Sequence, residues 1–390
     1  MADWTDAGLA TEIQRLKSWR SKVEAIEPVA LPDRQKFERE YMLAVLDGNL
    51  FWLETADWPH KNPSWYSPWI DPSVYLDRPY ADLAARMKAY STWASNVPTA
   101  AAAIKANLRG SLPRAFIDIG TNTFGPLADF LRKDVVTVFK DVGDDAARVE
   151  FTKQNEAAAS AFADLNRHLE SLRPSQTENF AMGSDLLARM LYATERVNTR
   201  VDEIEAMGRA DLLRNKQALA DACRQFAPGK TIAECVAKEE ASKTEGGDFG
   251  AYARQQLVDL KRFVIDHRVV TIPGEEEARV KQAPPYRAQN SAYIDTPGPY
   301  EKNMPAFFNI AAPDPKWPKA KQLAYDPAYL NYTMGKLMIR RLRDDWCKAR
   351  GAADDKSCWH DFHGAFLSYG GPPIPLVRGL MMGTPPQSVF

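Results

Sequence analysis

The stretch of sequence that decides the fold reads Asp326-Pro-Ala-Tyr-Leu-Asn-Tyr-Thr-Met-Gly-Lys-Leu-Met-Ile-Arg-Arg-Leu-Arg343. Asp326 is a favourable N-cap residue, and Pro327 stands at the first helical position, where its fixed φ and missing N–H are tolerated. The pattern then continues without a breaker to about Cys347. The stretch therefore predicts a long helix in the last part of the chain.

This helix has two chemically different faces. At about 100° per residue, one stripe collects two phenols and three cations, namely Tyr329, Tyr332, Lys336, Arg340 and Arg343. A second face carries Leu330, Met334, Leu337 and Met338. Phenols and cations can bind a carboxylate and stabilise an oxyanion, so we predict that the stripe lines a substrate-binding cleft. The alternative is a solvated cationic face paired with Asp344 and Asp345.

Helix signals dominate the N-terminal half of the chain. Apolar residues recur there at three- and four-residue spacing, as in Leu9, Ile13, Leu16, Val23 and Ile26, and again in Leu83, Met87 and Tyr90. Thr231 and Glu234 form a capping box directly after Pro228-Gly229, where one helix should end and the next begin. The β-branched residues 268–272 predict a short strand. The expected fold class is mainly α, with at most a few short strands.

Two segments rich in proline and aromatic residues interrupt the helical pattern, at residues 58–79 and 273–318. Their aromatic content is unlike that of disordered linkers, so we predict ordered loops packed on the helices. In this interpretation the aromatic residues bury apolar area, whereas the alternative for the first segment is an aromatic ledge for a sugar or peptide. We expect a helical region 1–272, a Pro-rich connecting region 273–325 and a helical region 326–390, or one domain throughout.

Composition and charge exclude several functional classes. The 390 residues are 45% hydrophobic and 26% charged, with a net charge of -1. These values are typical of globular proteins and lack the basic footprint of a nucleic-acid binder. No apolar run is long enough for a membrane span, and the first residues do not resemble a signal peptide, so the chain as written is expected in the cytoplasm. A peptide or another small anionic ligand is favoured by elimination.

The four cysteines allow a different location. Cys223 and Cys235 flank the Pro228-Gly229 turn, and Cys347 and Cys358 flank a turn at residues 351–356. Disulfides within these two pairs would suit an oxidising compartment such as the periplasm, for a mature or trimmed form, whereas four free buried thiols would suit the cytosol. Sequence does not choose between the two.

A last helix is predicted to begin after Ser357. It places Trp359, Phe362, Phe366 and Leu367 on an inward face, and His363 lies close to that face. We expect His363 to hold a backbone carbonyl, with acid–base catalysis together with Tyr332 as the alternative. A metal site made by His360, His363 and one of Cys347 or Cys358 is a weaker alternative, because the cysteine spacing is not a standard zinc pattern.

The C-terminal run, together with residues 362–378, resembles a signature of one bacterial family. That family is the domain of unknown function numbered 885, a set of zinc-peptidase-like proteins. Weaker landmarks follow in the same order upstream, at residues 47–54, 62–66, 228–234, 297–301, 307–309 and 313–315. The resemblance implies a multi-helix, gluzincin-type architecture, in which an HExxH helix and a glutamate from a later helix hold zinc.

The zinc-binding segment implied by this resemblance is absent from the chain. The five histidines are His60, His168, His267, His360 and His363, and no two are separated by four. An HExxH helix needs that spacing, because it places both imidazoles on one face. In the family the zinc helices lie between the landmarks matching residues 313–315 and Asp326, which only residues 316–325 join here.

The resemblance thus implies a family member without metal ligands, for which no cofactor is expected, although intact relatives hold zinc. We predict a non-catalytic remnant that keeps a peptide- or carboxylate-binding cleft. One alternative is a helical scaffold that binds a peptide or anion, and another is a hydrolase with a site other than HExxH. Loss of the segment should also expose apolar surface and favour self-association.

Overall fold

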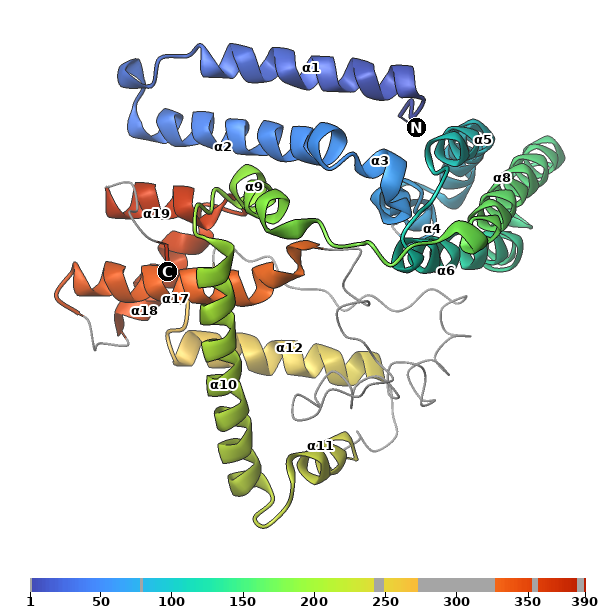
Figure 1. Cartoon of the computed structure of the whole chain (residues 1–390). Helices are drawn as coiled ribbons and strands as arrows, with labels where there is room; N and C mark the ends of the chain where they lie inside the picture. The colour runs from blue at the N-terminus through green and yellow to red at the C-terminus, as the bar shows by residue number, and fades with distance from the viewer. Residues whose placement is uncertain (1, 78–79, 242–248, 273–326, 353–356, 384–388) are drawn as a thin grey trace.

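The computed structural model describes residues 2–77, 80–241, 249–272, 327–352, 357–383 and 389–390, and helices account for most of them (Figure 1). Within these ranges the extended pairing is limited to an isolated bridge between Pro113 and Thr177. The prediction of a mainly α fold is therefore confirmed. None of the described helices combines the length and apolarity needed to cross a membrane. The connecting region 273–325 and the N-cap prediction at Asp326 lie outside the described residues.

The chain begins with a hairpin of two long helices, α1 (Asp6–Glu24) and α2 (Asp33–Leu50). Leu9, Leu16 and Val23 turn inward from α1 as predicted, but Ile26 lies beyond its end and is 45% exposed. A π-helical turn, Phe51–Thr55, extends α2.

The segment from residue 58 onward was predicted as a loop, but its described part consists of short helices. These are α3 (Trp58–Lys61), a 3₁₀ helix (Pro63–Trp69) and α4 (Ser73–Asp77). Proline fits the first turn of a helix, and Pro59 and Pro63 occupy such positions. Tyr66 is fully buried, and Trp65 and Tyr75 pack against the main core, as the burial interpretation expects.

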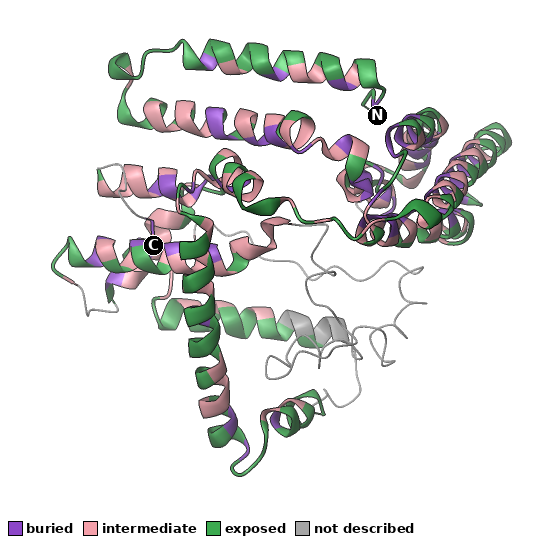
Figure 2. Ribbon diagram, in the orientation of Figure 1, coloured by how far each residue is buried: buried purple, intermediate pink, exposed green. Residues whose placement is uncertain are grey.

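The main core lies among α5 (Leu83–Asn107), α6 (Arg114–Phe130) and α8 (Asp145–Ser171). Figure 2 shows buried residues gathered along these helices. A second π-helical turn (Leu131–Val135) and α7 (Val136–Phe139) follow α6. The buried Asn155 accepts a hydrogen bond from the Tyr90 hydroxyl and donates one to the Leu131 carbonyl at 3.0 Å. This network gives the buried Asn155 side chain both an acceptor and a donor partner.

A helical arm leads away from this core and back to the C-terminal helices. Its members are α9 (Gly183–Glu195), α10 (Val201–Phe226), α11 (Ile232–Glu240) and α12 (Phe249–Asp266). The predicted capping box is present at the start of α11, where Thr231 and Glu234 bond each other's backbone N–H. Residues 268–272 are not a strand in the described part of the chain, so that prediction is wrong. Arg268 has φ 48°, which turns the chain there instead of extending it.

The C-terminal region pairs a 3₁₀ turn (Pro327–Leu330) and α17 (Asn331–Lys348) with α18 (Ser357–Leu367) and α19 (Ile374–Met382). The apolar face of α17 is buried at Met334 and Met338, which pack with Phe51 and Met190. Phe362 is buried as predicted, whereas Leu367 is 60% exposed, because α18 ends there and leaves its last residue facing solvent. C-terminal residues therefore pack directly on N-terminal elements.

Both predicted cysteine pairs form disulfides. Cys223 bonds Cys235 with the Cα atoms 5.8 Å apart, and Cys347 bonds Cys358 with the Cα atoms 5.9 Å apart. The first bond joins α10 to α11, and the second joins α17 to α18. Of the two alternatives left open by the sequence, the structure has the paired form.

Candidate functional site

The cationic stripe of α17 is divided between the protein surface and internal contacts. Tyr329 and Tyr332 lie with their ring centroids 5.1 Å apart, and Tyr332 is 77% exposed. Arg340 is also exposed, and no ion pair engages it within the described ranges. Lys336 and Arg343, in contrast, contact side chains on other helices. The two tyrosines and Arg340 are therefore the members of the stripe that remain accessible.

Arg343 is held in a way that the ion-paired alternative expects. Its guanidinium lies 3.8 Å from the centroid of the Trp359 ring on α18 and hydrogen-bonds the Asp344 carboxylate at 2.9 Å. A cation over an indole face is favourable and leaves little of the charge for a ligand. Arg341 and Arg378 both pair with Asp345, which joins α17 to α19.

Lys336 neutralises a buried carboxylate on α10. Its Nζ lies 2.5 Å from Asp211, which also accepts from Arg214 at 3.0 Å and Asn215 at 3.1 Å. Burial alone would raise the pKa of Asp211, but the hydrogen bond and charge of Lys336, helped by Arg214 and Asn215, bring that pKa below its ordinary value. Lys336 thus fastens α17 to α10, 125 residues away in sequence.

Lys336→Ala should therefore act on stability. Removing one of three partners of buried Asp211 is expected to lower the free energy of unfolding by about 1–2 kcal/mol, because the carboxylate loses its closest charge. Urea denaturation measures the change, and Arg340→Ala is the matched control, since Arg340 shares the stripe and is exposed. Equal stability of the two variants would contradict a structural role for Lys336.

His363 holds a backbone carbonyl, as predicted. Its Nδ1 lies 2.8 Å from the Val269 carbonyl oxygen, in the segment predicted as a strand. His360 lies 3.2 Å through Nε2 from the Thr271 hydroxyl and 2.9 Å through Nδ1 from Asp361. Hydroxyl, imidazole and carboxylate in this order resemble a nucleophile, its base and an orienting acid. The Asp361 side chain is 69% exposed, however, so this arrangement lacks the water-excluded surroundings that such catalysis uses.

The metal site suggested for His360, His363 and a cysteine is contradicted. Cys347 and Cys358 are joined to each other, and a disulfide sulfur is not the thiolate that binds zinc. Across the described residues, no group of three His, Cys, Asp or Glu side chains is placed to hold a metal ion. Within the described residues, no contact joins His363 to Tyr332. The structure therefore does not bring the two catalytic candidates together.

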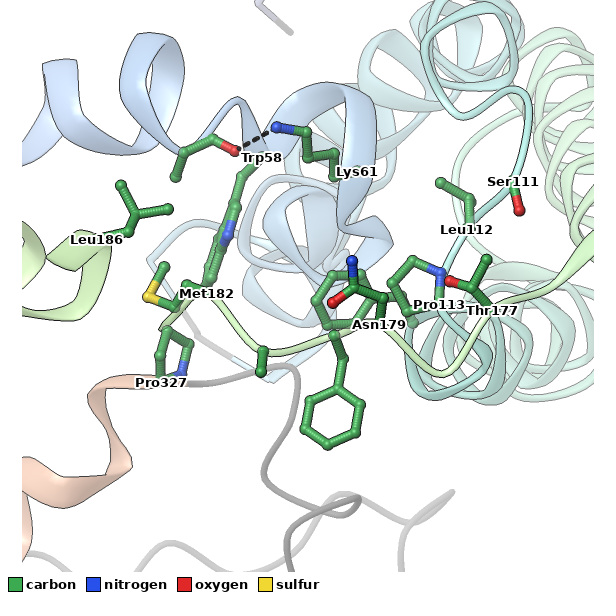
Figure 3. Close-up of a pocket in the computed structure, with 14 residues that line it drawn as sticks. Trp58, Lys61, Ser111, Leu112, Pro113, Thr177, Asn179, Met182, Leu186 and Pro327 are labelled. Atoms are coloured by element: carbon green, nitrogen blue, oxygen red, sulfur yellow. Dashed lines mark hydrogen bonds between the residues drawn. The ribbon is translucent and has the colours of Figure 1, made fainter. Parts of the chain in front are cut away.

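A cavity of about 610 Å³ lies away from α17, below α3 in Figure 3. Most of its described walls come from three segments distant in sequence: α3 with the preceding Ala56, residues 111–116 at the start of α6, and residues 177–186 leading into α9. Lining side chains include Trp58, Lys61, Leu112, Phe116, Asn179, Phe180, Met182 and Leu186, and Pro327 closes one side. The volume is within the range of small-molecule sites.

Two of these walls are fastened together by backbone hydrogen bonds. The Arg114 N–H donates to the Thr177 carbonyl at 2.7 Å, and the Thr177 N–H donates to the Leu112 carbonyl at 3.0 Å. The Ser111 hydroxyl donates to the Ser175 carbonyl in the same region. Because these bonds fix both segments, that side of the cavity is preformed.

The third wall is set by an irregular bend between α2 and α3. The π-helical turn Phe51–Thr55 comes first, and Asp57 then takes the left-handed conformation with φ 55°. The bend places the Trp58 ring 4.1 Å from that of Trp52 and lets Lys61 Nζ donate to the Ala56 carbonyl at 3.2 Å. Both π turns and left-handed non-glycine residues are enriched at functional sites.

The cavity combines apolar walls with few polar groups. Lys61 is the charged residue among the lining residues that the structure describes, and Ser111, Thr177 and Asn179 add neutral groups. None of the lining residues that the structure describes is a histidine or a carboxylate, the side chains that most often act as a general base. Sequence reasoning missed this site, although Trp58 belongs to the segment for which an aromatic ledge was an alternative.

Comparison with known proteins identifies relatives of unknown function. The family model described as bacterial protein of unknown function (DUF885) matches residues 1–325. A solved structure, that of "a putative lipoprotein of unknown function from Shewanella oneidensis", aligns with a TM-score of 0.68 and 15% identity, over 97% of this chain and 93% of that one. At this identity the likeness shows the fold alone. No curated protein matches the chain.

The match begins at the first residue and covers most of the sequence, which confirms the resemblance inferred from the landmarks. It ends directly before Asp326, so the C-terminal run itself lies outside the matched residues. The chain belongs to the bacterial DUF885 family.

Proposed function

We propose that this protein is a non-catalytic binding member of its family, and that the cavity below α3 takes an apolar or aromatic side chain of a peptide. The observation that carries the proposal is the cavity itself, whose described walls are apolar and aromatic and include the cation Lys61. A zinc-peptidase-like arrangement of helices belongs to the proposal too, and it rests on the sequence resemblance alone.

The apolar walls favour a side chain of the size of Leu or Phe. Trp58 and Phe180 present aromatic surface, and Met182 and Leu186 add flexible aliphatic contacts. Burying such a side chain contributes about 1.5–3 kcal/mol relative to water. Methionine adapts its shape to different partners, so we expect selection for apolar character more than for one residue type.

Lys61 supplies the contact for a carboxylate. Its ammonium donates to the Ala56 carbonyl and lies 3.6 Å from Asp57, which leaves N–H capacity for a ligand. A free C-terminal carboxylate next to an apolar last residue would satisfy both parts of the cavity. Lys336 and Arg343 of the stripe are engaged elsewhere, so we propose carboxylate recognition at Lys61 in place of the stripe.

The proposed absence of catalysis rests on the residues that the chain lacks. The sequence lacks two histidines four apart, so it cannot build the HExxH helix of intact relatives. The family match stops at residue 325, at the junction where the resemblance places the missing segment. A binding protein that keeps the family fold accounts for both observations.

We also propose that the protein resides in an oxidising compartment, namely the periplasm. Two turn-flanking disulfides are rare in cytosolic proteins. The structural neighbour from Shewanella oneidensis is called a lipoprotein, which agrees with an extracytoplasmic family member.

Calorimetric titration with N-acetylated tripeptides that end in Phe tests the proposal. We expect the peptide with a free carboxylate to bind, and Lys61→Met to weaken that binding by about three- to tenfold, because an exposed charge-assisted hydrogen bond is lost. Lys133→Met is the matched control, since Lys133 is an exposed lysine outside the cavity.

The same titration has a second arm with the C-terminally amidated peptide. Amidation should weaken binding to the wild type but leave binding to Lys61→Met unchanged, because the two changes remove the same contact. Mass spectrometry of the recovered peptide should find it intact. Absence of binding in the wild type, or cleavage of the peptide, would overturn the proposed function.

A further inference from the structure

His60 stands between two carboxylates at the outer side of the bend that carries Trp58 and Lys61. Its Nδ1 lies 2.5 Å from Asp57 Oδ1, and its Nε2 lies 3.0 Å from Asp6 Oδ1. Asp57 belongs to the bend, whereas Asp6 opens α1, 54 residues earlier. One imidazole thus joins the start of α1 to the wall of the cavity.

This geometry determines which form of the ring fits. An ionised carboxylate only accepts hydrogen bonds, and a neutral imidazole carries a single N–H. Both contacts can therefore be hydrogen bonds only when the His60 ring is doubly protonated. Loss of one proton would turn one of the two short contacts into a repulsion between lone pairs.

Two further cations share the carboxylates that contact His60. Lys61 lies 3.6 Å from Asp57, and Arg109 lies 4.0 Å from Asp6. The buried Tyr66 hydroxyl donates to the carbonyl of Pro59, the residue before His60, at 2.7 Å. The pKa of that phenol is raised, mainly by burial, so it stays neutral.

These surroundings favour the protonated ring. Partial burial alone would lower the pKa of His60, but the hydrogen bonds and charges of Asp6 and Asp57 outweigh burial and raise that pKa above 6.5. The hydrogen bond from His60 in turn lowers the pKa of Asp6. Both observations describe an ion pair that forms below the raised pKa of the imidazole.

We propose that His60 is a pH-sensitive clasp that holds the bend, and with it Trp58 and Lys61, in the ligand-binding arrangement. The inference rests on the proposed function, because it concerns the regulation of the same cavity. When His60 loses its proton, Asp57 keeps Lys61 as its nearby cation and draws the ammonium away from a ligand carboxylate. Peptide affinity should then fall as the pH rises.

The direction follows from the raised pKa. A histidine whose pKa is higher in the folded than in the unfolded protein stabilises the fold. This stabilisation is complete at a pH below the pKa of the unfolded protein, about 6.5. That contribution disappears as the pH rises through the folded value. The arrangement of the bend, and binding to it, should therefore be favoured at pH 5.5 over pH 8.5.

Titration of the wild type with the acetylated peptide at these two pH values tests the clasp. The peptide carboxylate is ionised at both, so a change in affinity reports on the protein. We expect at least fivefold tighter binding at pH 5.5, and no such difference in His60→Gln, whose amide does not titrate. His267→Gln is the control, because His267 is exposed and its ring contacts Phe263 of α12, away from the bend.

If His60→Gln folds poorly, a second measurement on the wild type tests the clasp. Nuclear magnetic resonance of the wild type with ¹³C-labelled histidine rings should give a pKa above 6.5 for the His60 imidazole and a lower His60 pKa in Asp6→Asn. A His60 pKa at or below 6.5, or equal peptide affinity at both pH values, would overturn the clasp but leave the cavity as a binding site. Failure to bind at every pH would instead overturn the proposed function and, with it, the clasp.

Discussion

Replacing Cys347 and Cys358 together by serine is expected to lower the free energy of unfolding by about 3 kcal/mol, the entropic value for a loop of this size. The bond joins α17 to α18 across eleven positions, and both sulfurs are buried. They pack with Leu342, Trp346 and Phe362, so serine would also place hydroxyls among apolar side chains.

Urea denaturation under oxidising conditions measures this loss, with the Cys223→Ser, Cys235→Ser variant as the comparison. That second disulfide closes a loop of similar size, but among the described residues its buried cluster adds just Ala227 to the two cysteines, at the α10–α11 turn. We expect a smaller effect on global unfolding there, because the tip of the arm can open locally. Two free thiols at Cys347 and Cys358 in the purified wild type would contradict the account.

Trp58→Ala should weaken binding of the acetylated Phe peptide by more than tenfold. The indole forms one aromatic wall of the cavity, and removing a large aromatic contact from a binding site typically costs about 1.5–3 kcal/mol. Its contact with Trp52 is lost as well, so some loss of stability is expected alongside.

Trp69→Ala is the matched control for this prediction. Trp69 lies in the same aromatic segment, is 60% exposed and does not line the cavity. Calorimetry of both variants, after circular dichroism has confirmed their folding, separates loss of the site from loss of an exposed tryptophan. Equal affinity of Trp58→Ala and the wild type would remove the cavity from the account.

The elements predicted correctly are those specified by neighbouring residues. The capping box at Thr231 needs only Glu234, three positions along, and the burial of Met334 and Met338 follows from spacing on one helix. The sequence showed which cysteines flank each turn. It did not decide between disulfides and free thiols, because that depends on how closely the two helices approach.

The errors came where tertiary partners decide the outcome. Residues 268–272 have strand propensity, but no neighbouring strand is present in the described ranges, and the Val269 carbonyl binds His363 instead. The proline content of residues 58–79 suggested a loop. The same content is equally compatible with short helices, because proline fits the first turn of a helix.

The candidate site depends even more on distant contacts. Nothing in the spacing of α17 reveals that Lys336 faces buried Asp211, which lies on another helix. The cavity draws its walls from three segments that are far apart in sequence, and each segment alone reads as loop or helix end. Division of the chain into regions at residues 273 and 326 stays a prediction.

A crystal structure of the chain with the acetylated Phe peptide tests the central claim most directly. The account predicts the uncleaved peptide in the cavity, with its aromatic side chain between Trp58 and Phe180 and its carboxylate at Lys61. Peptide bound along α17 at Tyr332 and Arg340, peptide cleaved beside Thr271 and His360, or a cavity filled by another part of the chain would contradict it.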